Sequence, residues 1–161
     1  MRLPAFPIPY EGETVSSVVA RFLGRTAGPT ERKLQLLGLG RTALTALVPL
    51  DLQALVDAMP LGHPWCNSPE LVLMRHTPVP LYLYFAHPQR AASSLQSLLG
   101  GLCGNPAAAL GLTVSAAKSL ARQSKFCALC VETDIATRGN AVSYPSSAAR
   151  SNPPSPRKCK G

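Results

Sequence analysis

The sequence predicts a mostly helical protein in which a small helical N-terminal domain is followed by an incomplete zinc knuckle and a disordered tail. Apolar residues recur at helical spacing in several segments, and glycine and proline bound these segments. The chain has 161 residues and 46% apolar content, which suits one domain with a buried core. We expect an extended arm over residues 1–12, a helical domain over 13–125, half of a zinc finger over 126–140 and a disordered tail over 141–161.

Three short helices are expected in the N-terminal half. Three prolines among the first ten residues favour an extended arm, after which residues 13–26 carry apolar residues at helical spacing up to Gly28-Pro29. These apolar residues are Val15, Val18, Val19, Phe22 and Leu23. Thr30 is suited to cap a second helix that ends at Gly38, and a third helix fits Leu50 to Met59 before Pro60. Short helices joined by tight turns are compatible with a helix-turn-helix.

The second half alternates helices with loops. Ser68-Pro69-Glu70 is typical of a helix start, with a capping serine, proline at the first helical position and an acid in the first turn. Residues 78–85 alternate and are aromatic, but their prolines forbid a central strand, so we expect an extended segment packed over helices. Further helices are expected over Pro88 to Leu99 and from Thr113 through Arg122. Residues 141–161 are rich in proline and serine, lack apolar periodicity and should be disordered.

Charge and cysteine usage narrow the function classes. Sixteen Lys and Arg against eight Asp and Glu give a net charge of +8, which favours polyanionic partners, with nucleic acid the first candidate. Five cysteines, an odd number, and a start without a secretory leader indicate a reducing cytoplasm. No apolar run approaches the roughly 20 residues that span a bilayer, so we expect a soluble protein without a membrane partner. No phosphate-binding loop or Gly-x-Ser-x-Gly elbow is present, which argues against an enzyme.

Cys127 and Cys130 form the first half of a zinc site. Two thiolates at this spacing sit on a tight turn and can share one tetrahedral ion, but structural zinc takes four ligands, usually from two such pairs. Three alternatives stay open: the two cysteines are simple buried thiols, His63 and Cys66 complete the site, or Cys159 adds only a third ligand. A dithiol redox enzyme is a less favoured alternative from another class, because a helix pattern precedes the pair and no strand pattern surrounds it. With two protein ligands the zinc would be held poorly.

Three separated segments carry a family pattern. The first is Pro7-x-Pro9 with Glu11 to Thr14, followed by Ser17 and Arg21 on the first expected helix. The second is Arg75-His76-Thr77-Pro78-x-Pro80-Leu81-Tyr82-x-x-Phe85, and the third is Lys125-Phe126-Cys127-Ala128-Leu129-Cys130 with Asp134 and Gly139. In this order they resemble three segments of the TniQ family of transposon target-selection proteins, the group that includes TnsD. The corresponding family motifs are an opening with proline, an acid and S-x-x-x-R, then R-H-T-x-x-P-Y-Y-x-x-F, and finally R-Y-C-P-x-C. Leu81 stands where an aromatic is common, and Ala128 replaces a proline.

The resemblance implies a non-catalytic adaptor. TniQ-like proteins recognise a target, either attachment-site DNA or a guide-RNA complex, and pass that information to an AAA+ ATPase that recruits the transposase. The resemblance implies that Cys127 and Cys130 are zinc ligands and that the short helices touch nucleic acid or partner protein. The candidate phosphate contacts, with an ordinary solvated face as the alternative, are Arg21, Arg25, Arg32, Lys33 and Arg41. A small helix-turn-helix regulator unrelated to transposition is the other alternative.

Beyond residue 140 the chain departs from the family pattern. The family would continue with Tyr-Trp, then His-Gln-Leu-Pro-Gly-Val and a second cysteine and histidine pair, none of which follows here. Codons for Pro145 to Asn152, read from their second base, permit His-Gln-Leu-Pro-Gly-Val. We therefore hypothesise that a one-base shift near residue 140 replaced the segment that completes the zinc site, leaving a truncated adaptor with an out-of-frame tail.

Several residues with chemical potential receive a structural interpretation. His76, in an Arg-His-Thr-Pro context, is expected to bond to backbone and pack beside the aromatic segment rather than bind metal. Trp65, Tyr82, Tyr84 and Phe85 are expected to be core aromatics rather than platforms for base stacking.

Overall fold

The computed structural model describes residues 2–40, 51–100, 106–111 and 128–139, and within these ranges every regular element is a helix. The mostly helical class is thereby confirmed. α1 spans Val15–Arg25, α2 Thr30–Leu36 and α3 Leu52–Asp57. α4 spans Pro69–His76, α5 Val79–Phe85, α6 Pro88–Leu99, α7 Pro106–Ala109 and α9 Ala128–Arg138. None of the described helices has the length and apolar character that crossing a membrane requires.

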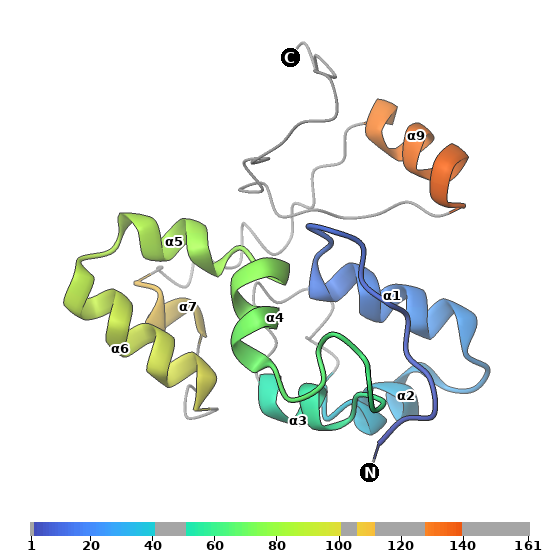
Figure 1. Cartoon of the computed structure of the whole chain (residues 1–161), viewed down its shortest axis with the longest axis horizontal. Helices are drawn as coiled ribbons and strands as arrows, with labels where there is room; N and C mark the ends of the chain where they lie inside the picture. The colour runs from blue at the N-terminus through green and yellow to red at the C-terminus, as the bar shows by residue number, and fades with distance from the viewer. Residues whose placement is uncertain (1, 41–50, 101–105, 112–127, 140–161) are drawn as a thin grey trace.

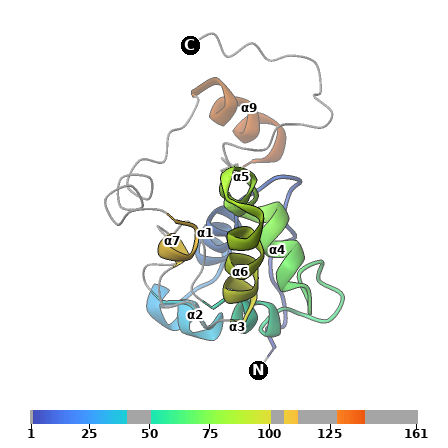
Figure 2. The same cartoon turned by 90° about the vertical axis from the view of Figure 1, so that its left-hand side faces the viewer.

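α4 lies in the middle of the molecule, with α1 and α2 on one side of it and α5, α6 and α7 on the other (Figure 1). α3 contacts both α4 and α6, and α4 also contacts α5. Figure 2 shows α5 and α6 on the face that is turned toward the viewer. The N-terminal arm is tied to the end of α3, because the backbone N–H of Leu3 donates to the Ala58 carbonyl at 2.8 Å.

The helices begin where the local sequence satisfies their first N–H groups. Thr14 Oγ1 accepts a hydrogen bond from Ser17 N at 3.3 Å at the start of α1. Asp51 Oδ1 accepts from Ala54 N at 2.8 Å at the start of α3. α4 and α6 both carry proline in the first turn, where a residue without an N–H leaves no donor unpaired.

Residues 79–85 form helix α5, so the prediction of an extended segment over residues 78–85 is wrong. Pro78 is the N-cap and Pro80 lies in the first turn, where a missing N–H costs no helical hydrogen bond. Thr77 Oγ1 accepts from Val79 N at 3.2 Å, which satisfies the donor that lies between the two prolines. The prolines that exclude a central strand therefore mark the start of a helix.

Other elements differ from the predictions at their boundaries. Thr30 is the first residue of α2 rather than its cap, a position that Pro29 takes. Ser68 precedes α4 as predicted, but its hydroxyl donates to the Cys66 carbonyl at 3.3 Å instead of capping the helix. α3 begins at Leu52, and α7 has no counterpart among the predicted elements. The helix expected over residues 113–122 and the tail over 141–161 lie outside the described residues.

One hydrophobic core joins the helices and the N-terminal arm. The apolar residues of α1 face this core as their spacing predicts, and Leu3 and Phe6 of the arm are buried in it. The largest fully buried apolar side chains are Trp65, Leu37, Leu52, Leu55, Met59, Leu73, Val18, Val19, Val56 and Val72. Because the arm contributes to the same core, the arm and the helical domain form one packed unit.

The end of α2 requires a glycine. Gly38 has a φ of +67°, and its N–H donates to the Gln35 carbonyl at 3.0 Å while Leu39 N donates to the Leu34 carbonyl at 2.8 Å. These two bonds form the Schellman arrangement that ends many helices at a left-handed residue. A Cβ on Gly38 would also collide with the Cβ of Ala54 on α3. Gly38 therefore lets α2 stop and lets α3 approach its end.

Gly38→Ala should lower the free energy of unfolding by about 2 to 5 kcal/mol, because a left-handed alanine costs about 1 to 2 kcal/mol and overpacking about 1 to 3 kcal/mol. Urea denaturation followed by circular dichroism measures this loss. Gly62→Ala is the matched control, since Gly62 has a φ of +81° with open space around it and should lose only the backbone part. Equal losses in the two variants would contradict the proposed contact with Ala54.

Candidate functional site

The buried carboxylate of Glu13 is the centre of a cluster of hydrogen bonds with Tyr10, Ser17 and Arg21. The Glu13 side chain is fully buried, and its two oxygens accept four hydrogen bonds. Oε1 accepts from Ser17 Oγ at 2.8 Å and Arg21 Nε at 2.9 Å. Oε2 accepts from Tyr10 N at 2.9 Å and Arg21 Nη2 at 2.6 Å. A bidentate arginine and two further donors supply what an ionised carboxylate needs away from water.

The Glu13 backbone joins this cluster to a distant part of the chain. His76 Nδ1 lies 2.7 Å from the Glu13 carbonyl oxygen, which makes it the donor of that hydrogen bond. The neighbouring Thr77 is also buried, and its hydroxyl donates to the Leu73 carbonyl at 2.5 Å. The prediction that His76 bonds to backbone is confirmed. Residues of the first and second family-like segments, 63 positions apart in sequence, thus meet at one buried point.

An aromatic cluster lies beside the Glu13 cluster. The Trp65 ring is fully buried and has its centroid 5.1 Å from that of His76 and 5.8 Å from that of His63. The Phe6 ring of the arm belongs to the same cluster, with its centroid 6.0 Å from that of Trp65 and 5.1 Å from that of Phe22 on α1. The Trp65 Nε1 atom is buried and has no hydrogen-bond partner among the described residues.

Burial lowers the pKa of both histidines. Desolvation is the main cause for His63, opposed by the hydrogen bond to the Pro7 carbonyl. Desolvation is also the main cause for His76. The hydrogen bond to the Glu13 carbonyl and the charge of the Glu13 carboxylate raise the pKa of His76, and the charge of Arg75 lowers it. His63 Nδ1 accepts from Trp65 N at 3.2 Å and Nε2 lies 3.3 Å from the Pro7 oxygen, so the backbone occupies both of its ring nitrogens. This geometry gives His63 a structural role and leaves no nitrogen for a metal.

The five predicted nucleic-acid residues divide into three groups. Arg21 and Lys33 are used inside the protein: the Arg21 side chain is 7% exposed and bound to Glu13, and Lys33 Nζ donates to the Leu23 carbonyl at 2.8 Å and to that of Thr26. Lys33 thereby satisfies carbonyls at the C-terminal end of α1. Arg25 and Arg32 are exposed. Arg41 lies outside the described residues.

The predicted zinc ligands are described only in part. Cys127 lies outside the described residues, and Cys130 lies in α9, which begins at Ala128. The backbone from Ala128 onward is therefore helical, whereas we predicted a tight turn over the pair. Cys66 is a half-buried free thiol. Within the described residues, no group of three or more potential ligands of the cysteine, histidine, aspartate and glutamate types could hold a metal ion.

Tyr10 connects α9 to the N-terminal arm. The guanidinium carbon of Arg21 lies 4.5 Å from the centroid of the Tyr10 ring, and that of Arg138 lies 4.9 Å from the same centroid. Arg138 also pairs with Asp134 one turn earlier in α9, at 3.8 Å. Cation–π contacts of this kind contribute about 0.5 to 2 kcal/mol each. The helix that begins between the two cysteines therefore meets the arm beside the Glu13 cluster.

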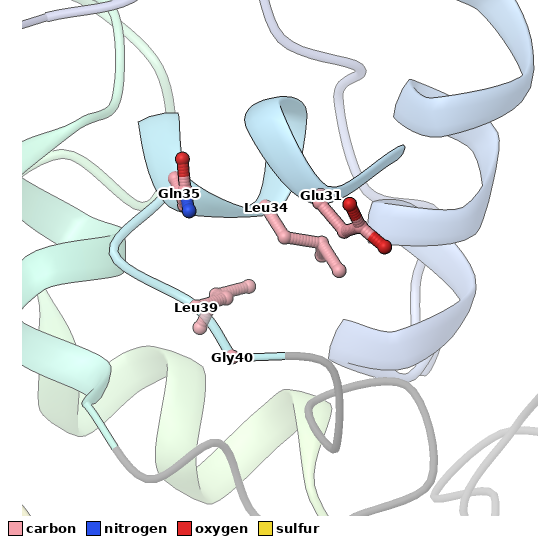
Figure 3. Close-up of a pocket in the computed structure, with 5 residues that line it drawn as sticks. All are labelled: Glu31, Leu34, Gln35, Leu39 and Gly40. Atoms are coloured by element: carbon pink, nitrogen blue, oxygen red, sulfur yellow. The ribbon is translucent and has the colours of Figure 1, made fainter. Parts of the chain in front are cut away.

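The hollow on α2 does not form a ligand site. It measures about 200 Å³ and is lined by Glu31, Leu34, Gln35, Leu39 and Gly40. Figure 3 shows Leu34 and Leu39 extending from successive parts of the chain toward this hollow. Small-molecule pockets usually enclose roughly 300 to 1,000 Å³ and hold several convergent polar groups. The described residues thus offer a buried polar cluster and exposed surfaces as functional features.

Sequence reasoning missed the role of Glu13. The signal was present in the spacing. Glu13 lies four residues before Ser17 and eight before Arg21, so all three side chains lie on the same side of the start of α1. It also misplaced two aromatics: Tyr84 and Phe85 are 83% and 77% exposed, so their assignment to the core is wrong. Trp65 is buried as predicted, and Tyr82 is half-buried.

Comparison with known proteins gives no relative. No family model, no curated protein and no solved structure matches this sequence. Any functional conclusion therefore rests on the residues and geometry described above.

Glu13→Gln should lower the free energy of unfolding by about 3 to 5 kcal/mol, because it leaves the Arg21 guanidinium buried without a counter-charge. Urea denaturation at pH 7.5 measures the loss. The control is Asp57→Asn, which changes an exposed acid on α3 and should shift stability by no more than about 0.5 kcal/mol. The double variant Glu13→Gln/Arg21→Met should recover part of the loss, since it removes both charges. A small loss in the single variant would show that the pair is not buried.

Stability should fall as pH drops below about 6.5, the ordinary pKa of histidine. Below this pH, His63 and His76 bind protons in the unfolded chain more readily than in the folded state, where burial lowers their pKa. Above that pH the folded and unfolded states are both neutral at these sites, so the contribution is fully present. Urea denaturation between pH 5 and 8 tests this. His76→Asn, whose amide can still donate to the Glu13 carbonyl, should flatten the slope, and His87→Asn, at an exposed position, should not.

Proposed function

We propose that this chain is a TniQ-type target-selection adaptor that binds target DNA, or a guide-RNA complex, and engages the AAA+ ATPase of a transposition machinery. The observation that carries the proposal is the meeting of two family-like segments at Glu13. Ser17 and Arg21 of the S-x-x-x-R pattern both bond to the Glu13 carboxylate, and His76 of the R-H-T pattern bonds to its carbonyl. Residues chosen only by resemblance would not be expected to share one buried cluster.

The net charge of the chain agrees with this proposal. Its +8 balance favours a polyanionic partner, and Arg25 and Arg32 are exposed near the turn between α1 and α2. Arg21 and Lys33 leave the proposed surface because their cationic groups bind inside the protein. The adaptor proposed here carries out no chemistry, and its nucleic-acid contacts come from exposed cations on a rigid helical frame.

The proposed metal is zinc, with Cys127 and Cys130 as its protein ligands. These residues belong to the third family-like segment, and α9, which contains Cys130, continues to the Tyr10 contact. Zinc at this position would restrain the start of α9. Two ligands alone hold zinc weakly, so the hypothesis of a reading-frame shift near residue 140 predicts low zinc affinity.

Two alternatives have a specific observation in their favour. α1 and α2 are short helices joined by a tight turn with Gly28 at a φ of +104°, which suits a helix-turn-helix regulator. α9 begins one residue after Cys127, and dithiol enzymes likewise place their cysteine pair at a helix N-terminus. Genes for a transposase and an AAA+ ATPase beside the coding sequence would favour the adaptor over the helix-turn-helix regulator. A zinc measurement and a dithiol titration test the redox enzyme: bound zinc favours the adaptor, and a reversible disulfide favours the enzyme.

The adaptor proposal predicts that the protein binds duplex DNA and co-purifies with the AAA+ ATPase from its own locus. Arg25→Gln and Arg32→Gln should each lower the slope of log affinity against log salt by about 0.9, the value for one phosphate contact. Fluorescence anisotropy with a duplex of the locus measures this slope. Arg2→Gln, which removes an exposed arginine of the arm, is the control for net charge. Retention of neither DNA nor ATPase by the wild-type protein would contradict the proposal.

A further inference from the structure

Two large aromatic side chains lie side by side in solvent at the C-terminal end of α5. Tyr84 and Phe85 are 83% and 77% exposed, although Val79 at the start of the same helix is fully buried. The two rings touch edge to face, with centroids 5.2 Å apart and planes at 89°. Since burial of an aromatic ring is strongly favourable, a pair left in water at one place marks a surface for a partner.

The segment of the chain that carries these rings contains no acidic residue. No aspartate or glutamate occurs between Leu71 and Val131, a stretch that includes α5, α6 and α7. Within the described part of this stretch, the arginines are Arg75 on α4 and Arg90 on α6, and both are exposed. His87 lies two residues and Arg90 five residues after Phe85; both are exposed, and the first turn of α6 carries no acid. A partner that reaches Tyr84 and Phe85 therefore meets positive charge and no nearby acid from this part of the chain.

We propose that Tyr84 and Phe85, with the exposed Arg90 in the first turn of the following helix, form a contact site for the unpaired bases of a single-stranded nucleic acid. Bases stack on exposed aromatic rings without regard to sequence, while cations hold the phosphates of the same strand. Two perpendicular rings allow a base that stacks on one ring to meet the edge of the other. A duplex keeps its base faces covered, so it would use the cations but not the rings.

The charge distribution favours a nucleic acid over a protein partner or a second copy of this chain. Aromatic pairs also occur at protein interfaces, but the core of such an interface is mostly apolar. Here the segment offers rings and positive charge only. The inference deepens the proposed adaptor function and rests on it for a biological setting, because it names which face of the adaptor meets the unpaired strand of a target or guide.

Fluorescence anisotropy of the full-length protein tests the site, with labelled 20-nucleotide oligo-dT, oligo-U and a duplex of equal length as probes. Tyr84→Ala and Phe85→Ala should each weaken binding of the single strands by roughly 5- to 100-fold, the range measured for base stacking on aromatic residues. Tyr84→Phe should bind as the wild type does, because stacking needs the ring and not the hydroxyl. Arg90→Gln should lower the salt slope for single strands by about 0.7.

Leu61→Ala is the matched control, since Leu61 is 80% exposed and lies outside α5. It should leave binding unchanged, and circular dichroism should show the wild-type helix content in every variant. The proposal is overturned if the wild type binds no single strand, or if the two alanine variants bind single strands as tightly as the wild type. It is also overturned if these variants instead abolish a dimer seen in sedimentation. If the protein binds single strands but does not co-purify with the ATPase, the adaptor proposal is wrong and the proposed single-strand site is still supported.

Discussion

The buried carboxylate of Glu13 is the constraint on which the rest of the structure depends. A charged group can lie in a protein interior only where its charge and all its lone pairs find partners. Tyr10, Ser17 and Arg21 supply those partners, and Arg21 Nη2 also donates to the Ile8 carbonyl at 2.9 Å. The arm must therefore fold back over α1 to satisfy the charge. Because His76 binds the Glu13 carbonyl, the end of α4 is held at the same point, and the position of α5 follows from it.

This arrangement separates structural cations from those that remain at the surface. Arg21 and Lys33 carry full charges, yet each is used to satisfy acceptors within the fold: a carboxylate in one case and the carbonyls at the end of α1 in the other. Arg25 and Arg32 belong to the same two helices and are exposed. The segment that follows α4 has a different character, since it combines exposed rings with cations and contains no acid. The proposed adaptor thus has two chemically distinct surfaces on one frame.

Proline placement explains both the successes and the main error of sequence interpretation. Pro69 and Pro88 each stand in the first turn of a helix that the local pattern predicts. Pro80 obeys the same rule and Pro78 is the N-cap of α5, but alternating aromatic residues favoured an extended segment. The deciding group is Thr77, whose hydroxyl accepts from Val79 N and so completes a helix start built from prolines. A hydroxyl outside the apolar pattern therefore decides the conformation of the segment.

By itself, the sequence determined the local elements: helical periodicity places α1, α3 and α6, and glycine at a left-handed position ends α2. It also determined the net charge and the cysteine spacing, which depend on composition alone. Only the tertiary structure decided which polar residues are internal. Whether Arg21 faces solvent or Glu13, and whether Phe85 faces the core or water, depends on contacts between segments far apart in sequence. Burial and pairing arise from the packing of the whole chain, and no local pattern encodes them.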